Sequence, residues 1–269
     1  SALSHTIKKL EASVGTAIWR KEGRRIQLTQ AGQLLLALAN RVLPQFIHSE
    51  QQLNNIAQGN KGKLSIGMEC HPCYQWLLKV VNPFLASSPD VDVDIKQAFT
   101  FGGMGALMAY EIDLLITPDP LFHKDLTYIP VFDYEHVLVV ANQHPLAQRN
   151  PTQEKYVLPH ELSDEVLITY PVEASRLDIF SQFLSPVGGC VKQHKIIETT
   201  EIILQMVNAN RGVAALPRWL IEEHQQTLAI SPIRLGKNGL FKQIFLGVRE
   251  HENQPKYVAD FIELAKQIT

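Results

Sequence analysis

The sequence lacks three features that define whole classes of proteins. No apolar run approaches the roughly 20 residues that a membrane-spanning helix requires, and the first residues do not have the pattern of a secretory signal peptide. Three cysteines in 269 residues are too few, and odd in number, for the disulfide framework of a small secreted protein. We therefore expect a cytoplasmic protein with no membrane partner, whose cysteines are free thiols.

Positive charge is concentrated at one end of the chain. The first 30 residues carry a net charge of +4, whereas the whole chain carries −2, so the remaining residues carry −6. A basic end on an acidic body favours a polyanion, such as double-stranded DNA, as the partner of that end alone. The alternative is the solvated face of an ordinary amphipathic helix, and residues 1–15 taken alone favour this alternative.

The basic end has the pattern of a helix followed by a hairpin. Apolar residues at 3, 7, 10 and 14 have the spacing of one helical face, and Gly15 is placed where a left-handed residue would end that helix. Residues 20–25 form a basic turn, and residues 26–28 alternate as a short strand does. This order predicts the second half of a winged helix-turn-helix.

Residues 29–57 predict one long helix. Thr29 is a suitable N-cap, and leucines together with Phe46 form a wide apolar stripe that requires a partner. Pro44 removes one backbone hydrogen bond, so a kink is expected near residues 40–44. Residues 59–62 contain two glycines and predict a flexible hinge, which makes an intrachain core helix the weaker alternative.

From Lys63 onward, short apolar strands alternate with amphipathic helices, which predicts an α/β architecture with parallel strands. A first unit extends to strands expected over 126–132 and 136–141. A second unit then includes a helix expected near 174–184. Two α/β lobes in one chain usually bind a ligand in the cleft between them, at the carboxyl ends of the strands.

Polar, sulfur-containing and aromatic residues follow several of the predicted strands. Hydroxyl groups and free amides at a helix start favour an anion such as a carboxylate, and a carboxylate of the protein would hold an ammonium group. The set suits a small zwitterion with a short apolar or sulfur-containing side chain, although each residue also has a structural alternative, such as helix capping or core packing. The candidate residues are Glu69, Cys70, His71, Thr100, Phe101, Thr117, Tyr170, Thr199 and Thr200.

Cys70, His71 and Cys73 also resemble metal ligands. Zinc needs about four ligands, but Cys70 and His71 are neighbours that point in different directions, and no second ligand pair follows. A Cys–His nucleophile lacks a residue that would orient the base. We therefore expect no metal, no cofactor and no enzymatic activity.

Two runs at the basic end resemble the DNA-binding domain of LysR-type transcriptional regulators: residues 1–15 (SALSHTIKKLEASVG) and 23–32 (GRRIQLTQAG). The runs at 111–114, 144–147 and 212–217 are similar to landmarks of the effector domain of that family. The family usually has glycine at the position of Tyr110, so the turn there is expected to differ. Two further helices of the DNA-binding domain are expected before Ser1.

This resemblance implies a fold in three parts: a partial winged helix-turn-helix (α+β), a long linker helix, and a two-lobed effector domain similar to periplasmic binding proteins (α/β). The chain would cross between the lobes near 141 and near 240. The implied boundaries are residues 1–30 for the DNA-binding part, 31–60 for the linker and dimerisation helix, and 61–269 for the effector domain, with lobe I at 63–140 and 241–269 and lobe II at 141–240.

The resemblance also implies partners. Linker helices pair antiparallel in a homodimer, which can form a homotetramer, and the regulator would act on RNA polymerase. Two such heads would read a two-fold-related site on DNA. The residues implied in DNA contact are Ser1, Ser4, His5 and Lys8 in the major groove, and Arg24 and Arg25 at phosphates or the adjacent minor groove.

Runs at 69–77, 132–135, 170–178 and 204–207 are similar to one subgroup of the family, which activates methionine-biosynthesis genes with homocysteine as coregulator. Homocysteine agrees with the zwitterion expected from the strand ends. Two alternatives stay open: a two-lobed solute-binding protein for a small amino acid, and a LysR-type regulator with a different small anionic effector.

Overall fold

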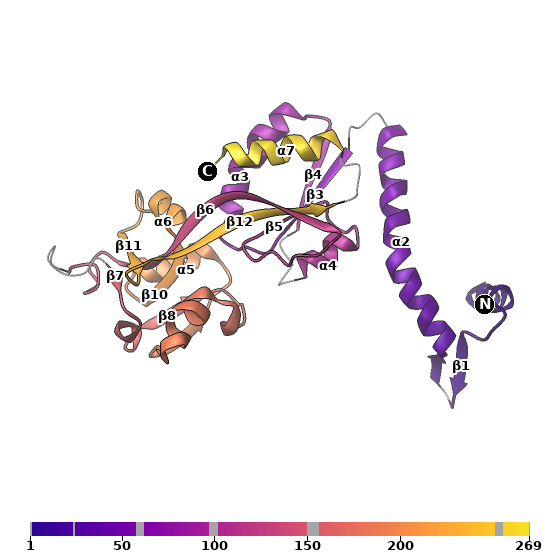
Figure 1. The fold of residues 1–269 in the computed structure, drawn as a ribbon, viewed down its shortest axis with the longest axis horizontal. Coiled ribbons are helices and arrows are strands. Elements are labelled where there is room, and N and C mark those ends of the chain that lie inside the picture. Colours follow the sequence, from indigo (N-terminus) through magenta and orange to yellow (C-terminus); the bar gives the residue numbers. More distant parts are fainter. Residues whose placement is uncertain are drawn as a thin grey trace. The chain divides into compact units, whose positions relative to one another are not determined.

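The computed structural model describes residues 2–23, 25–57, 62–96, 102–149, 156–250 and 255–268 (Figure 1). The chain divides into two compact units. One contains residues 1–62 together with 109–111, and the other contains residues 63–108 together with 112–269. No described helix is both long and apolar enough to cross a membrane.

The first unit begins with helix α1 (Ala2–Val14) and a two-stranded hairpin, β1 (Trp19–Glu22) and β2 (Arg25–Leu28), which confirms the expected helix and wing. The φ angle of Gly15 is 75°, and its N–H donates to the carbonyl oxygen of Glu11 at 2.9 Å, as in a left-handed helix end. The Glu11 carboxylate also accepts the N–H of Ile18 at 2.8 Å. One acidic side chain therefore fixes the turn between helix and hairpin.

Helix α2 (Gln30–Ala57) follows the hairpin and continues through Pro44. Thr29 is its N-cap, as expected, because its Oγ1 accepts the N–H of Gly32 at 3.1 Å. The same hydroxyl donates to the carbonyl oxygen of Ala17 at 2.7 Å. A side chain at Gly32 would meet the carbonyl oxygen of Ile18 at 2.2 Å, so this close junction requires glycine. Thr29 and Gly32 thus hold the helix start against residues 17 and 18, which lead into the hairpin.

The second unit is built on a ten-stranded sheet with the order β4-β3-β5-β12-β6-β10-β8-β9, in which β11 pairs with β6 and β7 pairs with β11. β3 runs parallel to β5, and β10, β8 and β9 run parallel to one another, whereas β6 and β12 are antiparallel to their neighbours. The strands are β3 (Gly62–Met68), β4 (Val91–Lys96), β5 (Leu114–Thr117), β6 (Leu126–Ala141), β7 (Tyr156–Val157), β8 (Val166–Thr169), β9 (Gln193–Ile196), β10 (Val213–Pro217), β11 (Ile230–Leu235) and β12 (Leu240–Arg249).

Helices cover the sheet in two lobes (Figure 1). In the first lobe α3 and α7 pack on the sheet through a shared core, where the rings of Phe84 and Phe261 lie 5.1 Å apart. The second lobe has its own core of residues from α5, α6, β8 and β10. This two-lobed α/β fold is the fold class expected from the sequence. The helices are α3 (Cys73–Ser87), α4 (Gly103–Met108), α5 (Thr200–Asn208), α6 (Arg218–His224) and α7 (Lys256–Gln267).

Strand β6 corrects one expectation. Its sixteen residues form a single strand where two were expected, and it pairs with β12 in the first lobe and with β10 and β11 in the second. The charged residues 133–135 interrupt the apolar pattern, but the Glu135 carboxylate is paired with Arg218 at 2.8 Å and with Arg234 at 2.7 Å. These ion pairs lower the pKa of Glu135, although burial opposes them. A paired charge therefore does not end the strand.

The segment 174–184 also differs from the single helix expected there. It forms a short turn, η2 (Ala174–Arg176), and a separate π-helix, η3 (Ile179–Leu184), followed by η4 (Ser185–Val187). Leu177 has extended backbone angles and separates the first two, and residues 176–178 border a pocket, although Arg176 is itself exposed. Tyr110 has a φ of 59°, so the turn expected to differ keeps the left-handed conformation that glycine favours.

Candidate functional site

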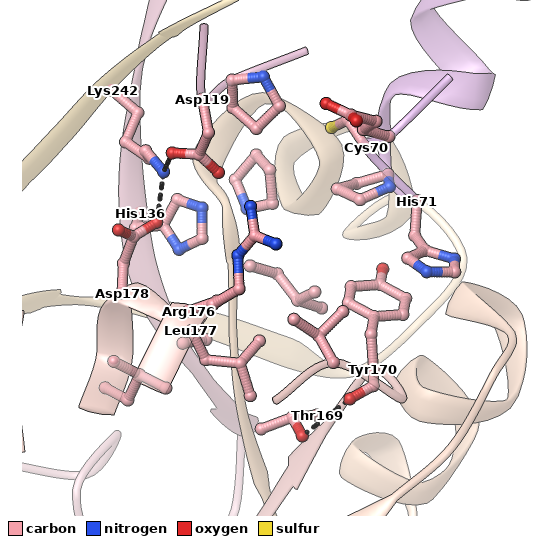
Figure 2. Close-up of a pocket in the computed structure, with 18 of the residues that line it drawn as sticks. Cys70, His71, Asp119, His136, Thr169, Tyr170, Arg176, Leu177, Asp178 and Lys242 are labelled. Atoms are coloured by element: carbon pink, nitrogen blue, oxygen red, sulfur yellow. Dashed lines mark hydrogen bonds and ion pairs between the residues drawn. The ribbon is translucent and has the colours of Figure 1, made fainter. Parts of the chain in front are cut away.

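A pocket lies in the second unit where strands of both lobes end (Figure 2). Residues 69–72 follow β3, residues 118–119 follow β5, and Tyr170 follows β8, so carboxyl ends of three strands meet there. Residues 176–179 and two side chains of the long strands, His136 and Lys242, complete the wall. The space free of atoms is about 750 Å³, a volume that includes solvent at the open mouth.

One wall of the pocket is ionic. The Nζ of Lys242 lies 2.6 Å from Asp119 and 2.9 Å from Asp178 (Figure 2). Burial alone would lower the pKa of Lys242, but the hydrogen bonds and negative charges of the two aspartates outweigh burial and raise it. Two carboxylates thus face one ammonium group, and the guanidinium of Arg176 lies beside them in the same pocket. This wall therefore contains both carboxylates and cationic groups that a ligand can contact.

His136 lies beside this wall, and its Nδ1 has no hydrogen-bond partner among the described residues. Burial lowers the pKa of His136 to about 4, against the opposing charge of Asp178. The ring is therefore neutral at pH 7 and adds no positive charge to the ionic wall. A buried ring nitrogen of this kind is available to a polar ligand atom or to a water molecule.

The opposite wall is aromatic. The rings of His71 and Tyr170 are stacked, with centroids 4.8 Å apart and planes at 7°. Burial lowers the pKa of His71, against the charge of Glu198. The Tyr170 hydroxyl lies 2.8 Å from Oγ1 of Thr200, and burial raises the pKa of this tyrosine. Both rings are thus held neutral and in a fixed orientation at pH 7.

Between these walls, Arg176 extends from η2 so that its guanidinium lies among the pocket residues (Figure 2). Arginine can bind a carboxylate through two parallel hydrogen bonds. The pocket therefore contains a guanidinium suited to a carboxylate and, beside it, the carboxylates of Asp119 and Asp178, which are suited to an ammonium group. This combination matches an amino-acid zwitterion.

A disulfide joins Cys70 and Cys73, whose Cα atoms are 5.3 Å apart. We had expected free thiols, and this expectation is wrong, because the turn into α3 brings cysteines three positions apart within bonding distance. Cys70 borders the pocket, and Cys73 is the first residue of α3. The third cysteine, Cys190, is free and exposed.

The structure places the residues expected to bind an effector in three groups. Four of them, Glu69, Cys70, His71 and Tyr170, border the pocket, although Glu69 also accepts the N–H of Gly103 at 2.9 Å. Three others do not border it: Thr117 accepts the N–H of Asp119, Thr199 is exposed at the start of α5, and Thr200 contacts Tyr170. Thr100 and Phe101 lie outside the described residues.

Sequence reasoning missed His136, Arg176, Asp178 and Lys242. A charged or imidazole side chain within an apolar strand was a signal for His136 and Lys242, because such a residue needs a partner when it is buried. No signal of this kind marked Arg176 and Asp178, because the segment that carries them was expected to be a regular helix. Their position depends on the extended backbone at Leu177.

Of the residues implied in DNA contact, Ser4, His5 and Lys8 are exposed on α1, and Arg25 is exposed on β2. Ser1 and Arg24 lie outside the described residues. Three side chains on one short helix and a cation on the adjacent hairpin can reach bases and phosphates together. Among the described residues, no group of three or more histidine, cysteine or acidic side chains is arranged to hold a metal ion.

Comparison with known proteins places these features in a family. The model of the LysR substrate binding domain matches residues 57–268. The HTH-type transcriptional regulator MetR of Escherichia coli K12 is 37% identical over 266 residues, which are 99% of this chain and 81% of that protein.

Solved structures agree with this comparison. The regulatory domain of MetR, a LysR family regulator from N. meningitidis, is 29% identical with a TM-score of 0.68, covering 77% of this chain and 93% of that one. A variant of that domain with two cysteines, three positions apart, replaced by serine is 27% identical with a TM-score of 0.67 and the same coverage. Cys70 and Cys73 of this chain have the same spacing.

Proposed function

This chain belongs to the LysR family of transcriptional regulators and is similar to MetR, and we propose that it regulates methionine-biosynthesis genes in response to homocysteine bound in the pocket. The observation that carries the proposal is the distribution of charge in the pocket. Arg176 would bind the carboxylate of the amino acid, and the carboxylates of Asp119 and Asp178, which also hold the Lys242 ammonium group, would bind the ammonium group of the amino acid.

The thiol side chain of homocysteine would also find matching residues in the pocket. Cys70 supplies sulfur to the pocket wall, and the stacked rings of His71 and Tyr170 supply a neutral surface for a short side chain. Sulfur atoms contact aromatic rings favourably. The name of the relatives supports methionine metabolism as the context.

Calorimetric titration tests the proposed effector. We expect homocysteine to bind this chain, and homoserine and methionine to bind more weakly. The Arg176→Gln variant should bind homocysteine at least about tenfold more weakly, since a charged hydrogen bond contributes roughly 1.5–3 kcal/mol. Arg211→Gln, which changes an exposed arginine that does not border the pocket, is the matched control. Unchanged affinity in Arg176→Gln would contradict the proposed orientation.

DNA would be bound by the head formed by α1 and the β1–β2 hairpin. The proposal includes a homodimer through α2, possible assembly into a homotetramer, and action on RNA polymerase. In a chain extended to the length of the relatives, Lys8→Gln and Arg25→Gln should weaken binding to all DNA sequences and reduce the slope of log affinity against log salt by about one each. Lys124→Gln, an exposed cation on the second unit, should leave the slope unchanged.

A further inference from the structure

The disulfide in the pocket wall contributes no charge that would hold a zwitterion. Its two cysteines differ in their access to the pocket. Cys70 is 6% exposed and borders the pocket, whereas Cys73 is 1% exposed and does not border it. Figure 2 shows Cys70 among the pocket residues, above His71. A molecule in the pocket can therefore approach one sulfur of the pair and not the other.

We propose that the pocket binds thiol amino acids covalently, by thiol–disulfide exchange at Cys70. This inference rests on the proposed function, because homocysteine is itself a thiol. The sulfur of the homocysteine thiolate attacks Sγ of Cys70, the bond between Cys70 and Cys73 breaks, and Cys73 leaves as a thiolate. The negative charge passes from the homocysteine thiolate to the Cys73 thiolate, and the proton that the homocysteine thiol loses beforehand goes to solvent. One disulfide replaces another, so the step needs no external oxidant or reductant.

The position of Cys73 favours this direction of attack. Cys73 is the first residue of α3, a helix of fifteen residues. The dipole at a helix N-terminus favours negative charge there, whereas the burial of Cys73 among apolar residues opposes it. The direction of attack is therefore set by access, since Cys70 borders the pocket and Cys73 does not. The cysteine that borders the pocket is thus the one attacked, and the other is the one released.

The same arrangement makes the modification reversible. After exchange, the Cys73 thiolate stays beside Cys70, because both belong to the same turn. It can attack the mixed disulfide and release homocysteine, so occupancy follows the concentration of the free thiol. Methionine and homoserine have no thiol and cannot enter this exchange. The chemistry would therefore separate homocysteine from the amino acids nearest to it in shape.

Intact-protein mass spectrometry after an acid quench tests the proposal. The oxidised chain with Cys190→Ser, which removes the exposed free thiol, is incubated with homocysteine, methionine or homoserine. We expect a mass gain of one homocysteine, located at Cys70 by peptide mapping, and no gain with methionine or homoserine. An unmodified chain under conditions that saturate homocysteine binding, or modification at Cys73 instead, would overturn the proposal.

Two variants complete the test. With Cys73→Ser the resolving thiol is gone, and the disulfide form of homocysteine should load Cys70 permanently. With Cys70→Ser the same reagent should leave Cys73 unmodified, because that sulfur is buried. Equal loading of the two variants would contradict the asymmetry, and circular dichroism checks that both are folded.

Calorimetry separates failure of this proposal from failure of the proposed function. The Cys70→Ser, Cys73→Ser double variant cannot undergo exchange but keeps Arg176 and the ionic wall. Selective homocysteine binding by this double variant, with no adduct on the oxidised chain, would remove the covalent step and leave the effector site. Absence of both binding and adduct would remove homocysteine from the site altogether.

Discussion

Helices α2 and α7 are similar in apolar content but differ in where that apolar surface lies. The apolar residues of α7, including Tyr257, Phe261 and Ile262, are buried in the core of the second unit. On α2, by contrast, Leu34 is 74%, Phe46 62% and Leu53 65% exposed. The contrast teaches that α7 completes the fold of its own chain, whereas α2 carries a stripe that another polypeptide can cover.

The two units also differ in how many apolar side chains they bury. Among the described residues from 3 to 54, Ile18 is the one hydrophobic side chain that is buried, whereas the second unit contains several contiguous cores. Stability of the second unit is therefore a property of this chain alone. Within the first unit, local hydrogen bonds such as those of Glu11 and Thr29 hold the elements together in place of a large core.

The largest expected effect is the loss of a core ring from α7. Phe261→Ala should lower the free energy of unfolding of the second unit by about 3–5 kcal/mol, because a fully buried ring leaves a cavity. Phe46→Ala on α2 is the matched control and should change it by less than about 0.5 kcal/mol. Urea denaturation followed by circular dichroism measures both. Similar losses in the two variants would erase the distinction between the helices.

The next effect concerns buried charge. Lys242→Met leaves Asp178, 11% exposed, without its cation and should cost about 3 kcal/mol of unfolding free energy. Lys79→Met removes a cation whose pair with Glu223 is exposed, and it should cost less than about 1 kcal/mol. The same urea experiment compares them. If the two losses were equal, the ionic wall would contribute no more than an ordinary surface pair.

Acid should destabilise the second unit through His136. Its pKa is lowered to about 4 in the folded chain, from 6.5 in the unfolded chain, so between these values the unfolded state binds more protons. Stability therefore falls as the pH falls from 6.5 toward 4, by roughly 2 kcal/mol between pH 7.5 and pH 5. The dependence should become shallower in His136→Gln and stay unchanged in His160→Gln, an exposed control. A steep dependence retained by His136→Gln would assign it to other groups.

The smallest effect on stability is expected on α2. The double variant Leu34→Ser, Leu53→Ser should leave the unfolding of the second unit within about 0.5 kcal/mol of the original chain. Its self-association, measured by sedimentation equilibrium, should weaken, because the exposed stripe is the surface available for pairing. Gln33→Ser, Gln51→Ser on exposed polar positions is the control. Undiminished association of the leucine variant would place the contact elsewhere.

The sequence pattern predicted the main elements of the fold and part of the pocket, but it did not predict the ionic wall. Periodicity and end signals were enough for α1, α2 and the two-lobed α/β fold, because helix caps such as Thr29 and Gly15 act locally. The position of Cys70 and Tyr170 at strand ends was also predictable, since parallel strands end on one edge. The partners of Lys242 lie 123 and 64 positions away in sequence, and no local pattern gives such a pairing.

The pairing of β6 with β12 limits how the two lobes can move relative to each other. They connect the lobes as one ladder from Leu240 opposite His136 to Arg249 opposite Leu126, with a single irregularity beside Ile244 and Phe245. Separating the lobes by a wide swing would require breaking backbone hydrogen bonds along this ladder. A small twist about the bulge has a lower free-energy cost, because backbone pairing is already interrupted there. A ligand in this pocket, whose lining comes from both lobes, would therefore change the twist between the lobes and would not separate them.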